Sequence, residues 1–204
     1  MAGKVSPELS FKNRNGVILF MVLKMVLVVG IGASGKTTLA RQIAKKMKFQ
    51  FVDSEQIKER VGDRTLVTSK PSSRRVESYK KIYEEMFKAL ERGQSVVTDA
   101  PHIVEMPQKG FLQNLQQQLI ERGIDAEIKI VWLKANKKTL RKTMSRRRRD
   151  SDKYKLENWR EFEESELNVF KVQHPHLAIK RKGDKVKHWE KLSKKLPKIK
   201  RFVH

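Results

Sequence analysis

The sequence contains no cysteine and comparatively few acidic residues. The absence of cysteine excludes a disulfide scaffold, a cysteine nucleophile and a cysteine-ligated metal, and it is typical of cytoplasmic, intracellular proteins. Only 23 Asp and Glu residues oppose 46 Lys and Arg residues, which leaves a formal net charge of +23 over 204 residues. Because such a field attracts polyanions, the composition predicts a nucleic acid or a similarly anionic partner.

Long apolar runs are also missing. The most apolar stretch, "GVILFMVLKMVLVVG", is interrupted by Lys24 and is shorter than the ~20 apolar residues that a membrane-spanning helix needs. It runs directly into a glycine-rich loop, so we interpret residues 25–29 as a buried strand and expect no membrane partner. Residues 1–20 are expected to form an N-terminal extension outside the folded domain.

The glycine-rich loop matches a phosphate-binding motif. The fixed positions of G-x-x-x-x-G-K-[ST] are filled by Gly30, Gly35, Lys36 and Thr37. The loop lies between the apolar strand and a segment with a helical apolar period, which is the order that this motif requires. Backbone N–H groups of such a loop converge on phosphate oxygens, Lys36 reaches the β- and γ-phosphates, and the Thr37 hydroxyl ligates Mg²⁺. The expected nucleotide-binding residues are Gly30, Ala33, Ser34, Gly35, Lys36, Thr37 and Thr38.

Strands and helices alternate along the rest of the chain. Further strands are predicted at residues 49–52, 95–99 and 126–133, with an edge strand at 177–179. Helices are predicted at residues 55–61, 73–92, 108–123, 136–150 and 157–170. The face of the helix at 73–92 that is expected to point inward holds Val76, Tyr79, Tyr83, Met86 and Leu90. This alternation predicts an α/β fold, a P-loop NTPase three-layer sandwich with a mostly parallel sheet.

Two carboxylates follow predicted strands, at the sheet edge where ligands of parallel sheets collect. Asp53 can orient an acceptor hydroxyl and take its proton. It also precedes a helix, so it suits an N-cap, and the two roles are compatible. Asp99 is expected to bind Mg²⁺ together with Thr37 or to hold the acceptor, with a capping role as the alternative.

A run of arginines follows the strand at 126–133. The segment "LRKTMSRRRRD" places them where a helix passes into a loop, which suggests a lid at about residues 141–155. Guanidinium groups on a lid can close over a transferring phosphoryl group and stabilise its charge. We expect Arg146 and Arg149 to act in catalysis and Arg141 to bind the donor, the alternative being contact with nucleic acid or simple solvation.

The composition changes after Phe170. Residues 171–204 hold 12 Lys and Arg and only 2 Asp and Glu. We expect a kinase domain over residues 21–170 and a basic C-terminal arm over 171–204 that follows the phosphates of a nucleic acid. The alternative is a solvated tail with a few apolar anchors.

Together these residues resemble the polynucleotide-kinase and zeta-toxin-like branch of the P-loop kinases, including phage-type DNA kinases. The resemblance runs from Met25 to Phe170 and rests on "GIGASGKTT", "FVDSEQI", "VVTDAP" and the arginines of "LRKTMSRRRRDSDK". It implies ATP as donor, Mg²⁺ as cofactor, Asp53 as general base and a lid arginine on the donor phosphates. Phage-type polynucleotide kinases carry an arginine three residues after the base, where this chain has Gln56. The residues that we expect to bind the substrate instead, beside Asp53 and Asp99, are Arg60, Arg74 and Arg75, with Lys58 as another candidate.

The expected function is therefore transfer of the γ-phosphate of ATP to a hydroxyl of nucleic acid, DNA more than RNA, at a 5′ end or on a hydroxymethylated base. The alternative is a small-molecule or nucleotide kinase whose basic tail is incidental. A non-catalytic nucleotide-binding protein and a toxin that acts on a sugar nucleotide are further alternatives.

Overall fold

The computed structural model describes residues 10–12, 18–20, 22–63 and 72–181. At its centre lies a five-stranded sheet in the order β4-β5-β3-β6-β7, in which every neighbouring pair is parallel. Its strands are β3 (Leu23–Val29), β4 (Gln50–Val52), β5 (Val96–Thr98), β6 (Ala126–Lys134) and β7 (Leu177–Lys180). The predicted α/β fold with a parallel sheet is confirmed.

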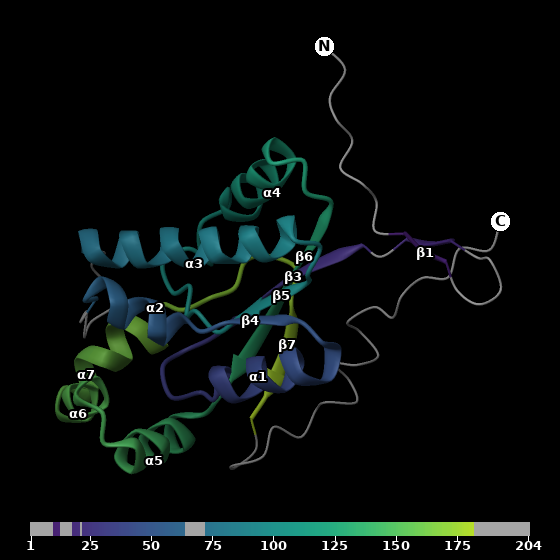
Figure 1. Ribbon diagram of the computed structural model, residues 1–204. Coiled ribbons are helices and arrows are strands. Elements are labelled where there is room, and N and C mark those ends of the chain that lie inside the picture. The colour runs from purple at the N-terminus through teal and green to yellow at the C-terminus, as the bar shows by residue number, and fades with distance from the viewer. Residues whose placement is uncertain (1–9, 13–17, 21, 64–71, 182–204) are drawn as a thin grey trace.

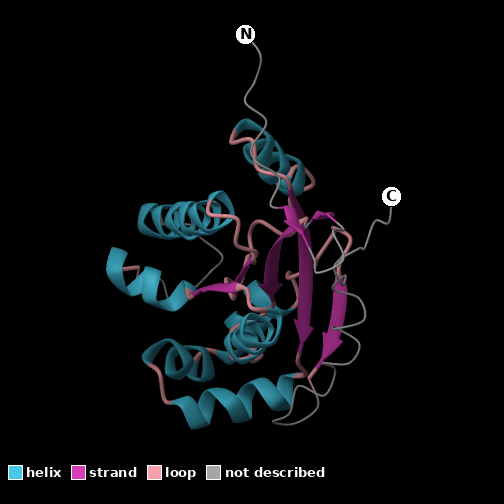
Figure 2. Cartoon of the chain, turned by 45° about the vertical axis from the view of Figure 1, so that its right-hand side comes forward, coloured by secondary structure: helices cyan, strands magenta, loops and turns pink. Residues whose placement is uncertain are grey.

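Helices cover both faces of the sheet, with α1 on one side and α3 and α4 on the other (Figures 1 and 2). The helices are α1 (Lys36–Met47), α2 (Ser54–Val61), α3 (Ser73–Glu91), α4 (Phe111–Glu121), α5 (Lys137–Arg147), α6 (Asp150–Glu157) and α7 (Trp159–Phe162), and a π-helix, Glu163–Leu167, follows α7. This arrangement gives the three layers that the alternation of strands and helices predicts.

The central strand β3 is buried on both faces. Met25 and Leu27 belong to a buried cluster with apolar residues of α3 and α4, whereas Val26 and Val28 belong to a second cluster with Leu39 of α1. Alternate side chains of a strand point to opposite faces, so an apolar run without polar interruptions suits a strand covered on both sides. The phosphate loop therefore begins from a strand whose last five residues are fully buried.

The edge strand predicted at 177–179 is present as β7, and it pairs with β6. The sheet thus continues beyond residue 170, where the basic arm was expected to begin, and only residues 182–204 of that arm lie outside the described residues. Burial explains why β7 belongs to the sheet, because Ile179 packs in the same apolar cluster as residues of α1.

The segment after β6 differs most from its prediction. The predicted helix at 136–150 ends at Arg147, because Arg148 takes a left-handed conformation with φ 51°. A separate helix, α6, then occupies residues expected to form a loop, and the predicted helix at 157–170 is instead α7 and the π-helix.

The buried face of α3 also differs at its first turn. Val76 is 61% exposed, so its predicted inward position is wrong, whereas the preceding Arg75 is only 4% exposed. The apolar pattern favours valine as the core residue, but the Arg75 guanidinium stacks on the Tyr79 ring, with 5.3 Å from Cζ to the ring centroid. The first turn of α3 therefore buries an arginine where a valine was expected.

Within the expected N-terminal extension, β1 (Ser10–Lys12) and β2 (Ile18–Phe20) form a small antiparallel pair. Among the helices of the described residues, none is both long and apolar enough to cross a bilayer.

Candidate nucleotide and acceptor site

The phosphate loop joins β3 to α1 and depends on two glycines. Gly30 has φ 144°, and a Cβ there would lie 2.6 Å from the Leu133 carbonyl oxygen, so only glycine fits. Gly35 has φ 99° and is the N-cap of α1, whose first N–H groups have no acceptor within the helix. The loop thus has the backbone shape and helix terminus that a phosphate group requires.

Lys36 folds back over the loop. Its ammonium donates a hydrogen bond to the Ile31 carbonyl at 3.0 Å, and the residue is only 8% exposed. Burial lowers the pKa of Lys36 to about 8, although the Asp99 carboxylate opposes the change. A cation held in a poorly solvated loop is well placed to exchange this carbonyl for phosphate oxygens.

Asp99 joins the loop to α2. The Thr37 hydroxyl donates to its Oδ2 at 2.5 Å, and the Ser54 backbone N–H donates to its Oδ1 at 3.0 Å. The structure therefore brings together the two residues that the sequence predicts as Mg²⁺ ligands. A hydroxyl and a carboxylate are the oxygen donors that Mg²⁺ prefers, and the ion commonly takes its other ligands from phosphates and water. This agrees with the described residues, which contain no cluster of three or more His, Asp or Glu side chains suited to a metal.

Asp53 lies next to this pair through its neighbour Ser54. Its Oδ1 accepts from the backbone N–H groups of Glu55 and Gln56 at 3.1 and 3.4 Å, so the residue caps α2. Its Oδ2 accepts from Arg41 of α1 at 2.9 Å. The capping alternative for Asp53 is thus observed, and its second oxygen is held toward α1 by an exposed arginine.

The arginines of the predicted lid point in different directions. Arg141 stacks on Trp159 at 4.4 Å, and Arg147 forms two hydrogen bonds with Asp152 at 2.8 and 3.0 Å. Arg146 is exposed on α5. Arg149 reaches α2, where it donates to Glu55 at 3.3 Å. Arg149 therefore contacts α2, the helix that Asp53 caps.

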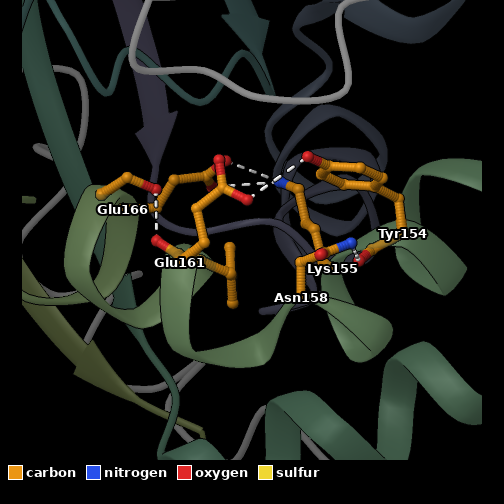
Figure 3. Close-up of a pocket in the computed structure, with 7 residues that line it drawn as sticks. Tyr154, Lys155, Asn158, Glu161 and Glu166 are labelled. Atoms are coloured by element: carbon orange, nitrogen blue, oxygen red, sulfur yellow. Dashed lines mark hydrogen bonds and ion pairs between the residues drawn. The ribbon is translucent and has the colours of Figure 1, made fainter.

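Lys155 contributes a cation that the sequence analysis did not select. Its ammonium donates to both carboxylate oxygens of Glu166, at 2.9 and 3.0 Å, and Figure 3 shows the two side chains meeting beside a small cavity. A Cβ added to Gly32 would lie 3.6 Å from the Lys155 Nζ, so the ammonium borders the phosphate loop. Its charge also contributes to the lowered pKa of Lys36. No sequence signal indicated this pair, because the two residues come from α6 and the π-helix.

Arg181 braces the loop from the end of β7. Its Nη1 donates to the Ala33 carbonyl at 3.0 Å, and its backbone N–H donates to the Lys134 carbonyl at 2.8 Å. Ala33 itself has φ 63°, a conformation that this contact helps to hold. The loop is thus tied to the far edge of the sheet as well as to its own strand.

The three predicted substrate arginines differ in orientation. Arg60 is exposed on α2, and Arg74 donates from the surface to the Gly62 carbonyl at 3.1 Å. Arg75 alone of the three is buried. The first turn of α3 therefore turns one arginine into the protein and leaves its neighbour at the surface.

Comparison with known proteins identifies the fold. A family model described as an AAA domain matches residues 25–166. No curated protein matches the sequence. The APS kinase of Mycobacterium tuberculosis, solved with AMPPNP and APS, aligns with a TM-score of 0.60 and 14% identity over 85% of this chain and 96% of its own. A sugar kinase from Janibacter aligns with a TM-score of 0.54 and 18% identity over 78% of this chain and 84% of its own. A gluconokinase from Sinorhizobium meliloti aligns with a TM-score of 0.52 and 13% identity over 78% of this chain and 83% of its own.

At these identities the likeness shows the P-loop kinase fold, and such domains use ATP and Mg²⁺, so the cofactor prediction is confirmed. The prediction of a nucleic-acid partner is wrong, because the kinases that share this fold are named for a sugar, APS and gluconate. The narrower resemblance to polynucleotide kinases is not supported either. Net charge describes the field around the whole chain, and it does not report which molecule the site itself accommodates.

Proposed function

We propose that this chain, which belongs to the AAA domain family, is an ATP-dependent kinase that phosphorylates a hydroxyl of a small molecule. The observation that carries the proposal is the run of contacts from Thr37 through Asp99 to Ser54, the residue after Asp53. It links the phosphate loop directly to the carboxylate at the start of α2. A P-loop protein that only hydrolyses or senses nucleotide has no need for an acceptor-side base at this position.

In this proposal the residues of the loop, from Gly30 to Thr38, cradle the phosphates. Lys36 neutralises the charge that develops on the transferring group, and Thr37 and Asp99 hold Mg²⁺. When bound, the ion would screen the phosphate oxygens and polarise the phosphoryl group. Lys155 adds a second cation beside Gly32, and Arg141, Arg146 and Arg149 remain our proposed lid groups.

Asp53 is the proposed general base. The acceptor O–H gives its proton to the Asp53 carboxylate, the acceptor oxygen forms a bond to the γ-phosphorus, and the bond from that phosphorus to the β–γ bridging oxygen breaks, leaving ADP. Asp53 keeps its Oδ1 on the α2 backbone, so its Oδ2, now paired with Arg41, is the atom that receives the proton. Arg41 fixes the direction of that oxygen.

We also propose how the chain is divided. Residues 1–20 form an extension, the kinase domain starts at residue 21 with its lid at about 141–155, and the basic arm starts after β7. A cytoplasmic location remains a proposal that rests on the absence of cysteine.

The test is transfer from γ-labelled ATP with Mg²⁺ to a small-molecule extract freed of macromolecules. We expect an acid-stable phosphate ester of a small molecule, which Asp53→Asn forms about 100-fold more slowly while AMPPNP binding persists. Release of label only as inorganic phosphate would contradict a kinase and favour the alternative of a nucleotide-binding protein without an acceptor.

A further inference from the structure

Several buried polar atoms on the acceptor side have no hydrogen-bond partner. Across residues 22–63 and 72–181, only five buried side-chain polar atoms lack one, and three of these are Arg75 Nη2, His102 Nε2 and Glu105 Oε2. Buried polar groups are almost always paired, so a cluster of unpaired atoms calls for a ligand that completes it.

The three residues form one neighbourhood. The Arg75 guanidinium lies over the Tyr79 ring, and the Tyr79 hydroxyl accepts from the His102 backbone N–H at 3.0 Å. The charge of Arg75 assists burial in lowering the pKa of His102, and it acts on Glu105 as well. His102, in the loop after β5, has φ 52° and is fully buried. The loop that carries Asp99 therefore also carries the groups that face Arg75.

Charged and neutral polar groups meet in this neighbourhood. Burial lowers the pKa of His102 to about 3, so the imidazole is neutral, with its Nδ1 3.0 Å from the Tyr83 hydroxyl. Burial also raises the pKa of Glu105. Lys58 of α2 adds a second cation, which is paired with Glu55 at 3.5 Å. The Arg75 Nη2 atom, by contrast, has no hydrogen-bond acceptor in the described protein.

This neighbourhood lies beside the donor side. Asp99, three residues before His102, accepts from the Thr37 hydroxyl of the phosphate loop at 2.5 Å and from the Ser54 N–H of α2 at 3.0 Å. Lys58 lies on the helix that Asp53 caps. A molecule that places a hydroxyl at Asp53 would therefore extend toward Lys58 and Arg75.

We propose that Arg75 binds an acidic group of the acceptor, so that the substrate is a small hydroxy compound carrying a carboxylate or phosphate besides its reacting hydroxyl. This inference rests on the proposed kinase function. A planar guanidinium pairs with either anion through parallel hydrogen bonds, and Lys58 adds charge without that geometry. His102 Nε2 and Glu105 Oε2 hydrogen-bond the remaining hydroxyls of the acceptor, which leaves none of the three atoms unpaired.

The experiment separates the small-molecule extract on an anion exchanger into acidic and neutral fractions and incubates each with the full chain and γ-labelled ATP with Mg²⁺. We expect phosphate esters from the acidic fraction, and analysis of the product distinguishes a carboxylate from a phosphate acceptor. Products from the neutral fraction alone would overturn the inference while leaving the kinase function in place. Transfer to neither fraction would overturn both.

A matched pair of variants then tests Arg75 itself. Arg75→Gln should raise the KM for the acidic acceptor about 100-fold, since a charge-assisted hydrogen bond is lost, and should leave AMPPNP affinity unchanged. Lys80→Gln, at an exposed position of the same helix, should change neither. Equal effects of the two variants would overturn the inference. AMPPNP binding shows whether Arg75→Gln is folded, and rescue of Arg75→Ala by methylguanidinium separates a lost ion pair from a damaged fold. If the Arg75 variants do not bind AMPPNP, the assay of acidic and neutral fractions with the unaltered chain tests the inference by itself.

Discussion

The donor side of the site, residues 30–37 with Asp99, differs from the acceptor side, which comprises Asp53, Lys58, Arg75, His102 and Glu105. On the donor side Lys36 and Thr37 already have partners at 3.0 and 2.5 Å. Of the buried side-chain polar atoms without a partner in the described chain, one, Ser34 Oγ, is on the donor side and three are on the acceptor side. The donor side is held by backbone geometry that serves any nucleoside triphosphate, whereas the acceptor side depends on a particular ligand to complete it. The contrast suggests that these two sides will respond differently to substitution.

The largest effect should come from removing the donor-side cation. Lys36→Ala should lower kcat/KM by about 1,000-fold, because the charge on the transferring phosphoryl group loses its buried partner. Thermal stability should hold, since the ammonium is poorly solvated in the folded protein. Steady-state kinetics and circular dichroism check both points, with Lys45→Ala at the exposed end of α1 as control. Activity within tenfold of the parent would remove Lys36 from the mechanism.

Asp53→Asn should lower kcat by about 100-fold, because the acceptor loses its base. Asparagine caps a helix as well as aspartate does, so α2 should keep its stability. The measurement is kcat together with AMPPNP affinity, which should not change. Glu59→Gln, an exposed substitution on the same helix, serves as control. A kcat close to that of the parent would leave Asp53 as a cap alone.

The structural role of Lys155 can be tested separately from a catalytic role. Lys155→Ala should destabilise the fold by about 3–5 kcal/mol, because the buried Glu166 carboxylate then loses the Lys155 ammonium. The double variant Lys155→Met with Glu166→Leu should recover most of that stability. If Lys155 serves the donor, the double variant still transfers phosphate roughly tenfold more slowly. Parental activity in the stable double variant would make the pair purely structural. Chemical denaturation and kinetics provide the two readouts.

The lowered pKa of Lys36 predicts a pH dependence on the donor side. Below pH 8 the lysine is protonated in the free protein, whereas above pH 8 it loses its proton and must regain it to bind phosphate. AMPPNP affinity should therefore fall roughly fivefold from pH 8 to pH 9, with proton uptake on binding. Calorimetry in two buffers of different ionisation enthalpy measures that uptake. Lys36→Arg, which stays charged, should show none, and equal uptake by both proteins would contradict the assignment.

The smallest effect is expected where the lid contacts α2. Glu55→Gln removes the partner of Arg149, but both side chains are about half exposed, and such pairs contribute at most about 1 kcal/mol. The acceptor KM should change less than threefold in kinetic assays. Glu91→Gln, in an exposed pair with Arg122, is the control. A tenfold change would show that this contact holds the lid in place.

The donor side could be predicted from the sequence because its residues are either close together in the chain or placed by the order of the parallel strands. The glycines and Lys36 are consecutive in the chain, and Asp99 meets Thr37 because parallel strands end at one edge. The strands themselves could be predicted because β3 and β5 hold apolar runs buried on both faces, and β6 is rich in β-branched and aromatic residues. The edge strand β7 was anticipated from its apolar residues alone.

The remaining contacts could not be predicted because they depend on tertiary packing. Arg75 is buried by a ring one helical turn away, against an apolar pattern that favours Val76. Lys155 meets Glu166 only because α6, α7 and a π-helix fold back on one another, and no periodicity indicates a π-helix. The nucleic-acid partner was inferred from total charge, a property of the whole chain that does not identify the molecule bound at one site.

The bond from Arg181 to the Ala33 carbonyl has a consequence for biosynthesis. The residues that shape the loop leave the ribosome long before the arginine that braces it. A nascent chain that has not yet emerged to residue 181 carries the complete motif without its brace. The ability to bind ATP should therefore appear only after β7 has docked, so incompletely synthesised chains should bind little nucleotide.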